Sequence, residues 1–273
     1  MSGHTTAAAV RDEPVAVRDG RLRLHVKVAG SGSPLLYFHP LAGLDWQPFL
    51  DRLAERHTVY APELPGTSED DPHAIQEVDS LLDLLLAYEE ALLALGIEGA
   101  AAIGQSFGGM LAAELASIFP ALFRKLVLMA PIGLWRDDAP IPLVEMIAAP
   151  PEALPRYLFS DPQSPAAQAA LSLPDDPELV PQAIAARVWA IGCASKFTWP
   201  LADHGLAGRL HRIAAPTLIV WGRNDALVPP VYADELASRI RGSRVALLDD
   251  CGHVPQVDQP EATQTLIADF LAS

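Results

Sequence analysis

Ser106 lies at the centre of the pentapeptide Gly104–Gly108, which has the pattern Gly-x-Ser-x-Gly. The apolar run 100–103 before it is typical of a buried strand, and the run 109–116 after it is typical of a helix. A serine on so sharp a strand-to-helix turn projects its hydroxyl clear of the sheet, at the positive end of the helix. The bare pentapeptide also occurs in ordinary turns, but in this position it predicts a nucleophilic serine.

A serine nucleophile requires a base, because a free hydroxyl attacks poorly at neutral pH. The chain has eight histidines, and His253 stands out because it lies in the loop between the last expected strand, 243–248, and the last expected helix, 260–271. Such a loop opens at the same sheet edge as Ser106. A surface-loop histidine is the alternative, and we expect His253 to be the base.

An imidazole base is usually oriented by a buried carboxylate, which also stabilises the imidazolium. Asp225 directly follows the expected strand 217–221 and is the leading candidate, with a turn aspartate as the alternative. Two rival pairs also stand near strand ends: Asp137 with Asp138, and Asp249 with Asp250. The first pair follows the preceding strand, where an acid can also be placed. The second pair is too close to His253 in a short loop to turn back toward the ring.

The order of these residues adds specificity. Ser106, Asp225 and His253 follow one another as Ser, Asp, His, which is the order of the α/β-hydrolase triad and differs from the chymotrypsin and subtilisin orders. Each residue alone is weak evidence, but the three in this order, each after an expected strand, predict one catalytic triad.

A tetrahedral intermediate needs N–H donors for its oxyanion, and preorganised backbone amides supply them. One donor is expected at Phe107, directly after the nucleophile. The other is expected in the loop after strand 34–39, at Leu41, because Pro40 has no N–H. His39 ends that strand, and we expect it to brace the loop through hydrogen bonds rather than to act as a base.

The elements that must position these residues alternate along the chain. Besides 100–104, 217–221 and 243–248, the expected strands are 14–18, 22–29, 34–39, 57–61 and 124–130, with 18–20 as a turn. The expected helices are 44–56, 71–95, 109–116, 230–240 and 260–271. Strands alternating with helices imply a mostly parallel sheet covered on both faces.

The alternation breaks at Pro131. Residues 136–200 hold 11 of the 25 prolines, with helical patches at 142–147 and 181–191 and no convincing strand. A long loop is the alternative, but the patches favour a small helical cap over the strand ends. The expected division is therefore a core over 1–135, a cap over 136–205 and the rest of the core over 206–273.

Composition limits the partners. Half of the 273 residues are hydrophobic, 19% are charged and the net charge is −15, which argues against a nucleic acid or an anionic membrane as partner. Residues 1–10 lack a basic start followed by an apolar core, and no apolar run reaches the roughly 18–20 residues of a membrane span. Two cysteines are too few for a disulfide framework. We expect a cytoplasmic protein, and its oligomeric state stays open, with a homodimer as one option.

Aromatic residues gather in or beside the expected cap. They are Trp135, Tyr157, Phe159, Trp189, Phe197 and Trp199. Packing of the cap is the alternative for each, but together they favour an apolar substrate pocket, and all of them except Tyr157 are expected to line it. Arg156 and Arg187 are candidate carboxylate ligands, with solvated surface arginines as the more common alternative. No metal is expected, because Asp203, His204 and His211 match no zinc spacing.

Taken together, these motifs resemble the α/β-hydrolase superfamily, from about Leu22 to the C-terminus. The likeness rests on the segments 39–43, 104–109, 216–225 and 252–253. It implies an α/β fold with a mostly parallel eight-stranded sheet flanked by helices, and a small helical cap inserted after the sixth strand. It also implies a nucleophilic Ser106, the acid Asp225, the base His253 and oxyanion donors at Leu41 and Phe107.

The departures from the family narrow the reaction. His39-Pro40 stands where many members have His-Gly, which stiffens the loop. A serine nucleophile disfavours epoxide hydrolases and haloalkane dehalogenases, which carry an aspartate. The meta-cleavage C–C hydrolases typically have Ser-Met-Gly-Gly at the nucleophile, whereas this chain has Phe107 in place of the methionine. They also typically have an aromatic residue after the histidine, where this chain has Val254.

The sequence therefore favours a cofactor-free serine hydrolase that cleaves a carboxylic ester of an apolar small molecule through an acyl-enzyme. One alternative is a C–C bond hydrolase acting on a vinylogous diketone of the meta-cleavage type. Another is a scaffold that binds a small apolar ligand without turnover. The fold alone does not decide among these.

Overall fold

The computed structural model describes residues 9–68, 70–200 and 202–273. The expectation of no leader segment concerns residues 1–10, of which 1–8 lie outside this part. The strands are β1 (Arg11–Val17), β2 (Leu22–Gly30), β3 (Ser33–Phe38), β4 (His57–Pro62), β5 (Ala100–Gln105), β6 (Phe123–Met129), β7 (Thr217–Gly222) and β8 (Arg244–Leu248). They form one sheet in the order β1-β2-β4-β3-β5-β6-β7-β8.

The sheet is mostly parallel. The β1–β2 and β2–β4 pairs are antiparallel, and every pair from β4–β3 through to β7–β8 is parallel. The connection from β1 to β2 is the expected turn, with Arg18, Asp19 and Gly20 all at positive φ. The predicted fold class is confirmed. Because the central strands are parallel, their carboxyl ends lie at one edge of the sheet.

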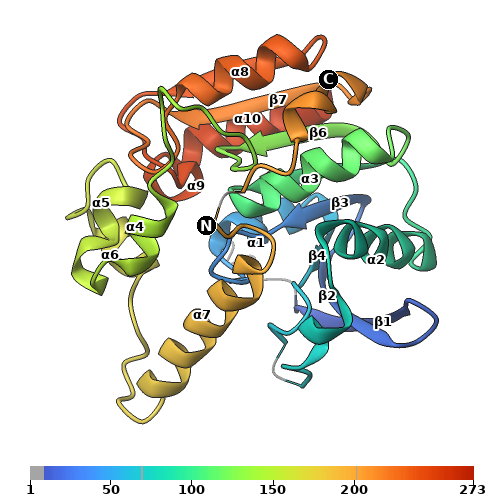
Figure 1. Ribbon diagram of the computed structural model, residues 1–273, viewed down its shortest axis with the longest axis horizontal. Helices are drawn as coiled ribbons and strands as arrows, with labels where there is room; N and C mark the ends of the chain where they lie inside the picture. The colour runs from blue at the N-terminus through green and yellow to red at the C-terminus, as the bar shows by residue number, and fades with distance from the viewer. Residues whose placement is uncertain (1–8, 69, 201) are drawn as a thin grey trace, which may run out of the picture.

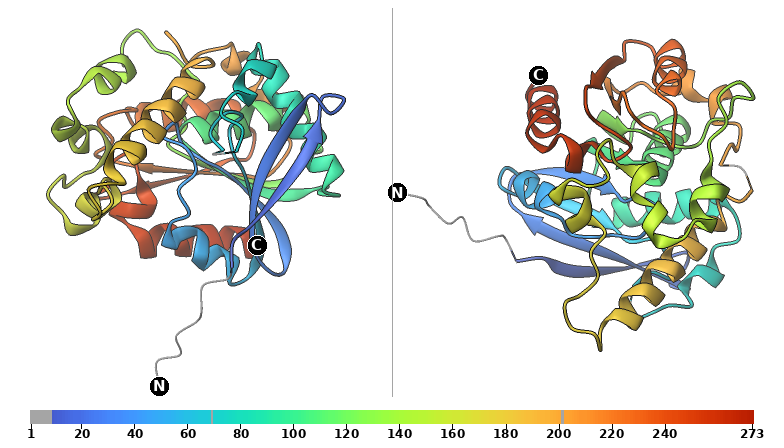
Figure 2. Two further views of the ribbon diagram at one scale, coloured as in Figure 1. Left: turned by 90° about the horizontal axis from the view of Figure 1, so that it is seen from below. Right: turned by 90° about the vertical axis from the view of Figure 1, so that its left-hand side faces the viewer.

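Helices cover both faces of the sheet (Figure 2). On one face lie α1 (Pro48–Ala54) and α10 (Pro260–Ala272), and on the other lie α2 (Leu81–Ala94), α3 (Phe107–Ile118) and α8 (Val231–Arg239). Strand β5 shows why two cores form, since successive side chains point to opposite faces. Ala101 and Ile103 join the α1 and α10 core, whereas Ala100 and Ala102 join the other.

The predicted helix over 71–95 is wrong in its first part. A 3-10 helix, η1 (Ala74–Glu77), comes first, and α2 begins only at Leu81. Val78 is extended, and Ser80 caps α2 by accepting the Asp83 N–H while the Asp83 carboxylate accepts the Ser80 N–H. This capping box fixes the start of the helix more strongly than the apolar spacing does.

A helical cap follows β6 (Figure 1). It contains α4 (Leu143–Ala148), α5 (Pro155–Leu158), α6 (Pro165–Ala170) and α7 (Val180–Ser195), with η2 (Pro151–Ala153) among them; η3 (Leu206–Gly208) and η4 (Leu210–Arg212) follow before β7. The patches at 142–147 and 181–191 correspond to α4 and α7. Among the described residues between β6 and β7 there is no strand. The boundaries at 136 and 205 stay a prediction.

The longest helices of the described part do not suit a lipid bilayer. None of them has the length and hydropathy to cross one. The short α9 (Pro255–Asp258) lies between β8 and α10 and completes the elements.

Candidate active site

Ser106 occupies a strained turn between β5 and α3. Its backbone has φ 55° and ψ −115°, a combination that a non-glycine residue seldom adopts. The turn requires glycine at Gly108, where a Cβ atom would collide with the backbone carbonyl groups of Phe38 and His39 at the end of β3. The strain and the close approach together hold the serine at the carboxyl edge of the sheet.

One hydrogen-bonded chain joins Ser106, His253 and Asp225. Ser106 Oγ lies 2.9 Å from His253 Nε2, and His253 Nδ1 lies 2.9 Å from Asp225 Oδ2. The carboxylate accepts the Nδ1–H, which leaves Nε2 as the acceptor for the serine O–H. All three residues are buried. The structure therefore brings together the three side chains that the sequence analysis selected.

Asp225 is fixed by the loop that carries it. Its Oδ1 accepts the backbone N–H groups of Leu227, at 2.9 Å, and Val228, at 2.8 Å, which leaves Oδ2 for the imidazole. Asp225 therefore fulfils both of the roles considered for it. Its Oδ1 accepts the N–H groups of the turn, and its Oδ2 binds the imidazole of His253. These bonds fix the orientation of the carboxylate, so it is already in place to accept the Nδ1–H of His253.

The rival carboxylates point elsewhere. Asp138 forms a two-pronged ion pair with Arg136, and Asp137 accepts the indole N–H of Trp135. Asp249 pairs with Arg223, at 2.7 Å. These side chains are exposed, and none contacts the imidazole of His253.

The two expected oxyanion donors are the backbone N–H groups of Leu41 and Phe107. Phe107 opens α3, where the first N–H groups of a helix have no intrahelical acceptor. Leu41 lies in the loop after β3, which the Gly108 contact holds against the start of α3. Within the described residues, neither N–H donates to another protein atom. Both are free to bind an anion.

His39 braces this loop, as the sequence analysis expected. The backbone N–H of Leu64 donates to Nε2 at 3.1 Å, so the ring proton is on Nδ1, which donates to Pro40 O at 2.8 Å. Burial lowers the pKa of His39 from 6.5 to about 4. The ring is therefore neutral near pH 7, and its two hydrogen bonds fix the carbonyl that precedes the Leu41 N–H.

A cavity of about 270 Å³, which we call the Ser106 cavity, opens above Ser106 and His253. The core contributes Leu41 and Leu227 to its wall, and the cap contributes mainly apolar side chains from α4, α5 and α7. These cap residues are Met146, Ile147, Leu154, Leu158, Phe159 and Ile191. Arg187 of α7 is a charged residue of the same wall. The cavity suits an apolar molecule with one polar or anionic end.

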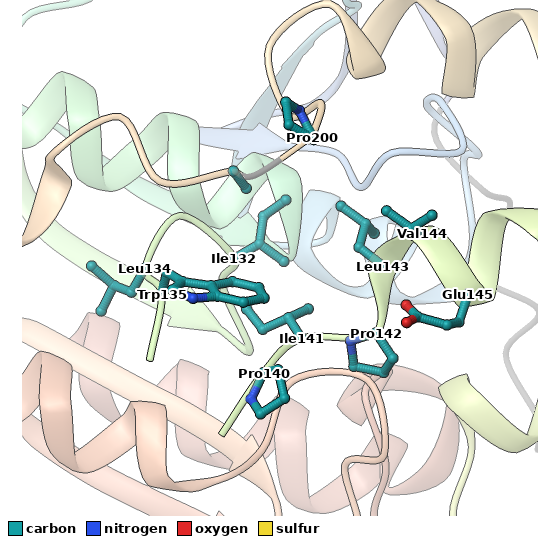
Figure 3. A pocket seen from close by; sticks show the side chains of 11 residues that line it. Ile132, Leu134, Trp135, Pro140, Ile141, Pro142, Leu143, Val144, Glu145 and Pro200 are labelled. Carbon is teal, nitrogen blue, oxygen red and sulfur yellow. The ribbon is translucent and has the colours of Figure 1, made fainter. Parts of the chain in front are cut away.

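Of the five aromatic residues expected in the pocket, Phe159 lines the Ser106 cavity. Trp135 belongs instead to a different pocket, where it lies with Ile132, Pro140 and Ile141 (Figure 3). Its indole N–H donates to Asp137, which turns the ring toward that pocket. The expectation for Trp135 is corrected on this ground.

The remaining three aromatic residues also lie away from the Ser106 cavity. Trp189 donates its indole N–H to Gly66 O at 2.7 Å and so pins α7 to the core. Phe197 is buried in the main hydrophobic core, and Trp199 is exposed. Trp189 and Phe197 therefore follow the alternative of packing that the sequence left open, whereas Trp199 lies at the surface. Arg156, the second candidate arginine, stacks on Tyr157.

A second depression adjoins the Ser106 cavity, and we call it the outer groove. It has a volume of about 400 Å³ and lies between the start of α1, α6, α9 and the start of α10. Five residues line both spaces: Asp45, Gln47, Ala170, Gln256 and Val257. The small side chains of Ala166 and Ala169 on α6 leave room in the groove. The two spaces are therefore neighbours that share a wall.

Two other candidates for chemistry, the Asp12 cluster and Cys251, have structural explanations. Asp12, His25 and Glu63 form a cluster with metal-ligand spacing, but Lys27 Nζ lies 3.4 Å from Asp12 and 3.6 Å from Glu63. The ammonium supplies the positive charge that the carboxylates need. Cys251 is buried, and burial raises the pKa of its thiol to about 12. It is therefore not a thiolate at neutral pH.

Comparison with known proteins agrees with this geometry. The alpha/beta hydrolase family matches the chain over residues 28–264, and the chain belongs to that family. It is thus a hydrolase. A 2-hydroxy-6-oxo-6-phenylhexa-2,4-dienoate hydrolase from Burkholderia cepacia is 28% identical over 92% of each chain.

Solved structures with the same fold include both a meta-cleavage hydrolase and an esterase. The 2-hydroxy-6-oxo-6-phenylhexa-2,4-dienoate hydrolase of a Rhodococcus species has a TM-score of 0.75 at 22% identity, over 97% of this chain and 100% of that one. Naproxen esterase from Bacillus subtilis has a TM-score of 0.72 at 16% identity, over 97% and 92%. At these identities the likeness establishes the fold.

Proposed function

We propose that the protein is a serine hydrolase of carboxylic esters with Ser106 as nucleophile, His253 as general base and Asp225 as the acid that orients it. The observation that carries the proposal is the continuous chain from Ser106 Oγ through the imidazole to Asp225 Oδ2, with both contacts at 2.9 Å. A binding scaffold without turnover has no need of this chain, which is buried and fully paired.

The geometry supports a two-step reaction. Ser106 Oγ attacks the ester carbonyl carbon while its proton passes to His253 Nε2, and the Leu41 and Phe107 N–H groups bind the oxyanion. The ester C–O bond then breaks, and the imidazolium returns the proton to the departing alkoxide. A water molecule, deprotonated by the same nitrogen, attacks the acyl-enzyme and releases the acid. Asp225 stays ionised and stabilises the imidazolium in both steps.

The walls of the site support an apolar substrate. Leucine, isoleucine, methionine and phenylalanine side chains dominate the Ser106 cavity, and the outer groove adds space beside it. A substrate with a short acyl group fits the cavity alone, whereas a longer apolar chain needs the groove. We therefore propose that the groove receives the distal part of longer substrates.

C–C bond hydrolysis of a vinylogous diketone acid is the second candidate. Arg187 on the wall of the Ser106 cavity favours it, because a guanidinium can pair with the substrate carboxylate. The Burkholderia relative carries a name of this reaction class. Against it, Val254 stands directly after His253, at the position where the resemblance to these enzymes implies an aromatic residue.

A substrate panel tests the choice. Purified protein is assayed with p-nitrophenyl esters of increasing acyl length and with a 2-hydroxy-6-oxo-dienoate ring-fission product. Hydrolysis of the esters with kcat/KM at least tenfold above that for the dienoate supports the ester assignment. The reverse preference transfers the same three residues to C–C cleavage.

A further inference from the structure

The backbone of the loop that carries His253 is held from three sides. The His253 N–H donates to Leu158 O at 2.8 Å, and the His253 carbonyl accepts from Gln105 Nε2 at 3.2 Å. The neighbouring Gly252 N–H donates to Asp258 Oδ2 at 2.6 Å. Leu158 belongs to the cap, Gln105 precedes the serine, and Asp258 ends α9. The position of the imidazole therefore depends on residues outside the loop.

Asp258 joins this loop to the cap through a single oxygen. Besides the Gly252 N–H, its Oδ2 accepts the backbone N–H of Ser160, at 2.9 Å, in the segment that follows α5. The cap and the loop approach so closely that a Cβ atom on Gly252 would lie 2.7 Å from Leu158 O and 2.9 Å from Ser160 N. Two chain segments almost a hundred residues apart thus meet at one carboxylate.

The joined segments are both functional parts of the site. On one side of Asp258 lies the loop of His253, and on the other lie Leu158 and Phe159, which line the Ser106 cavity. A shift of the carboxylate moves the imidazole and the cavity wall together. The bond from the His253 N–H to Leu158 O joins the same two segments, and Asp258 braces them at a second point.

We propose that Asp258 is a positioning residue, which holds the His253 loop against the cap so that the base and the cavity wall are assembled as one unit. The inference rests on the proposed role of His253. Two N–H donors on one ionised oxygen form charge-assisted bonds, which are stronger than bonds to a neutral acceptor. Burial raises the pKa of Asp258, and the two N–H donors oppose that shift by stabilising the anion.

The test compares Asp258→Ala and Asp258→Asn with Asp250→Asn. Asp250 lies in the same loop, is exposed, and its side chain makes no hydrogen bond within the described residues, so its change controls for lost charge. For each variant, kcat and KM for p-nitrophenyl butyrate, the rate of fluorophosphonate labelling at Ser106, and the thermal midpoint are measured. A purely structural role changes the midpoint and leaves the labelling rate of the folded protein unchanged.

Asp258→Ala is expected to lower kcat and the labelling rate together by roughly 100-fold, because a misplacement of about 1 Å in a reacting group has that effect. KM is expected to rise as well, but by less than kcat falls, because Asp258 also holds the part of the cavity wall that Leu158 and Phe159 form. Asp258→Asn retains an acceptor oxygen, so it should recover part of the rate and remain about three- to tenfold below wild type. Asp250→Asn should match wild type.

A folded Asp258→Ala protein with the wild-type kcat and labelling rate overturns the proposal. If that variant does not fold, an Asp258→Asn protein with unchanged kcat and labelling rate overturns it equally. If wild-type protein is labelled at Ser106 and the Asp258 variants keep the wild-type kcat and labelling rate, the positioning role is refuted and the proposed function stands. Wild-type protein that is not labelled at Ser106 refutes the proposed function, and the positioning role falls with it.

Discussion

Ser106 and His253, which are 147 residues apart in the chain, meet through a 2.9 Å contact between Oγ and Nε2. The meeting point is fixed from both sides. The backbone of Ser106 is strained at φ 55° because the turn into α3 is tight, and the backbone of His253 is clamped between the cap and Gln105. In the proposed reaction, proton transfer from Ser106 to His253 would thus need little reorganisation, which is the condition for efficient general-base catalysis.

Replacing the acid should reveal its orienting role. Asp225→Asn should lower kcat for a short aryl ester by roughly 10³–10⁴-fold, because the amide favours the wrong imidazole tautomer. The measurement is the initial rate of p-nitrophenyl butyrate hydrolysis. Asp138→Asn is the matched control, since within the described part of the chain the Asp138 carboxylate bonds to Arg136 and not to His253. Loss of activity in the Asp138 variant with full activity in the Asp225 variant would move the acid to the end of β6.

The contact between α3 and the loop after β3 should matter for the oxyanion. Gly108→Ala should lower kcat by about 100-fold, because its Cβ atom pushes the Phe38 and His39 carbonyls, and with them the Leu41 N–H, out of place. Gly192→Ala in α7 meets nothing within 4 Å and should leave kcat unchanged. Equal kcat values in the two variants, both folded by circular dichroism, contradict the oxyanion assignment.

The outer groove should set the length of substrate that the protein accepts. Ala169→Leu fills part of the groove and should lower kcat/KM for a dodecanoyl ester about tenfold, the cost of about 1.4 kcal/mol of lost binding. The butanoyl ester should react as before. Gln168→Leu adds a leucine to α6 at a position that does not line the groove and serves as the control, although it also removes the bond from Gln168 Nε2 to Pro162 O. A uniform loss for both esters would show that the groove does not receive substrate.

Arg187 separates the two candidate reactions. Arg187→Leu should leave kcat/KM for a neutral ester within about threefold of wild type, because no charged group of that substrate needs the guanidinium. With a dienoate substrate, loss of a charge-assisted hydrogen bond should lower kcat/KM by about 10–100-fold. Steady-state kinetics with both substrates give the comparison. An equal loss on both substrates points to a role for Arg187 in holding the cap.

The buried His39 should make stability depend on pH. Its pKa is lowered from 6.5 to about 4 in the folded protein, so the unfolded chain binds a proton first as the pH falls. The stabilising contribution is fully present above about pH 6.5 and is lost as the pH falls toward about 4. Between pH 7 and pH 5 the free energy of unfolding should fall by about 2 kcal/mol from this residue.

Urea unfolding of wild type and His39→Gln at both pH values measures this contribution. The variant cannot be protonated at this position, so its free energy of unfolding should fall less between pH 7 and pH 5. Parallel losses in the two proteins would show that His39 is not held neutral by the fold.

The triad candidates could be predicted from the sequence because each is tied to a strand end. In a parallel sheet those ends share one edge, so Ser106 after β5, Asp225 after β7 and His253 after β8 had to lie near one another. Leu41 stays a prediction as an oxyanion donor, based on the absence of an N–H group at the preceding Pro40. All eight strands were predicted with bounds within three residues of the observed ones, with β1 the least accurate because its first residues are polar.

The cap could not be predicted in the same way. Helices α5 and α6 have four and six residues, too short for a periodic pattern, and tertiary contacts decide which side chains they turn toward Ser106. Trp189 illustrates the difficulty. It lies in the cap, as expected for a pocket residue, but its indole N–H donates to Gly66 O and the side chain does not line the Ser106 cavity. Leu158 and Asp258 carried no sequence signal, as their contacts with the His253 loop exist only in the folded chain.

The most direct test is covalent labelling of the nucleophile. Wild-type protein is incubated with a fluorophosphonate, its intact mass is measured, and the modified peptide is identified; Ser106→Ala is treated in parallel. We predict one adduct per chain, on Ser106, with loss of ester hydrolysis, and neither labelling nor hydrolysis in a folded Ser106→Ala protein. Ester hydrolysis that persists in that variant, or a stoichiometric adduct on another residue, would contradict the assignment of Ser106 as the nucleophile.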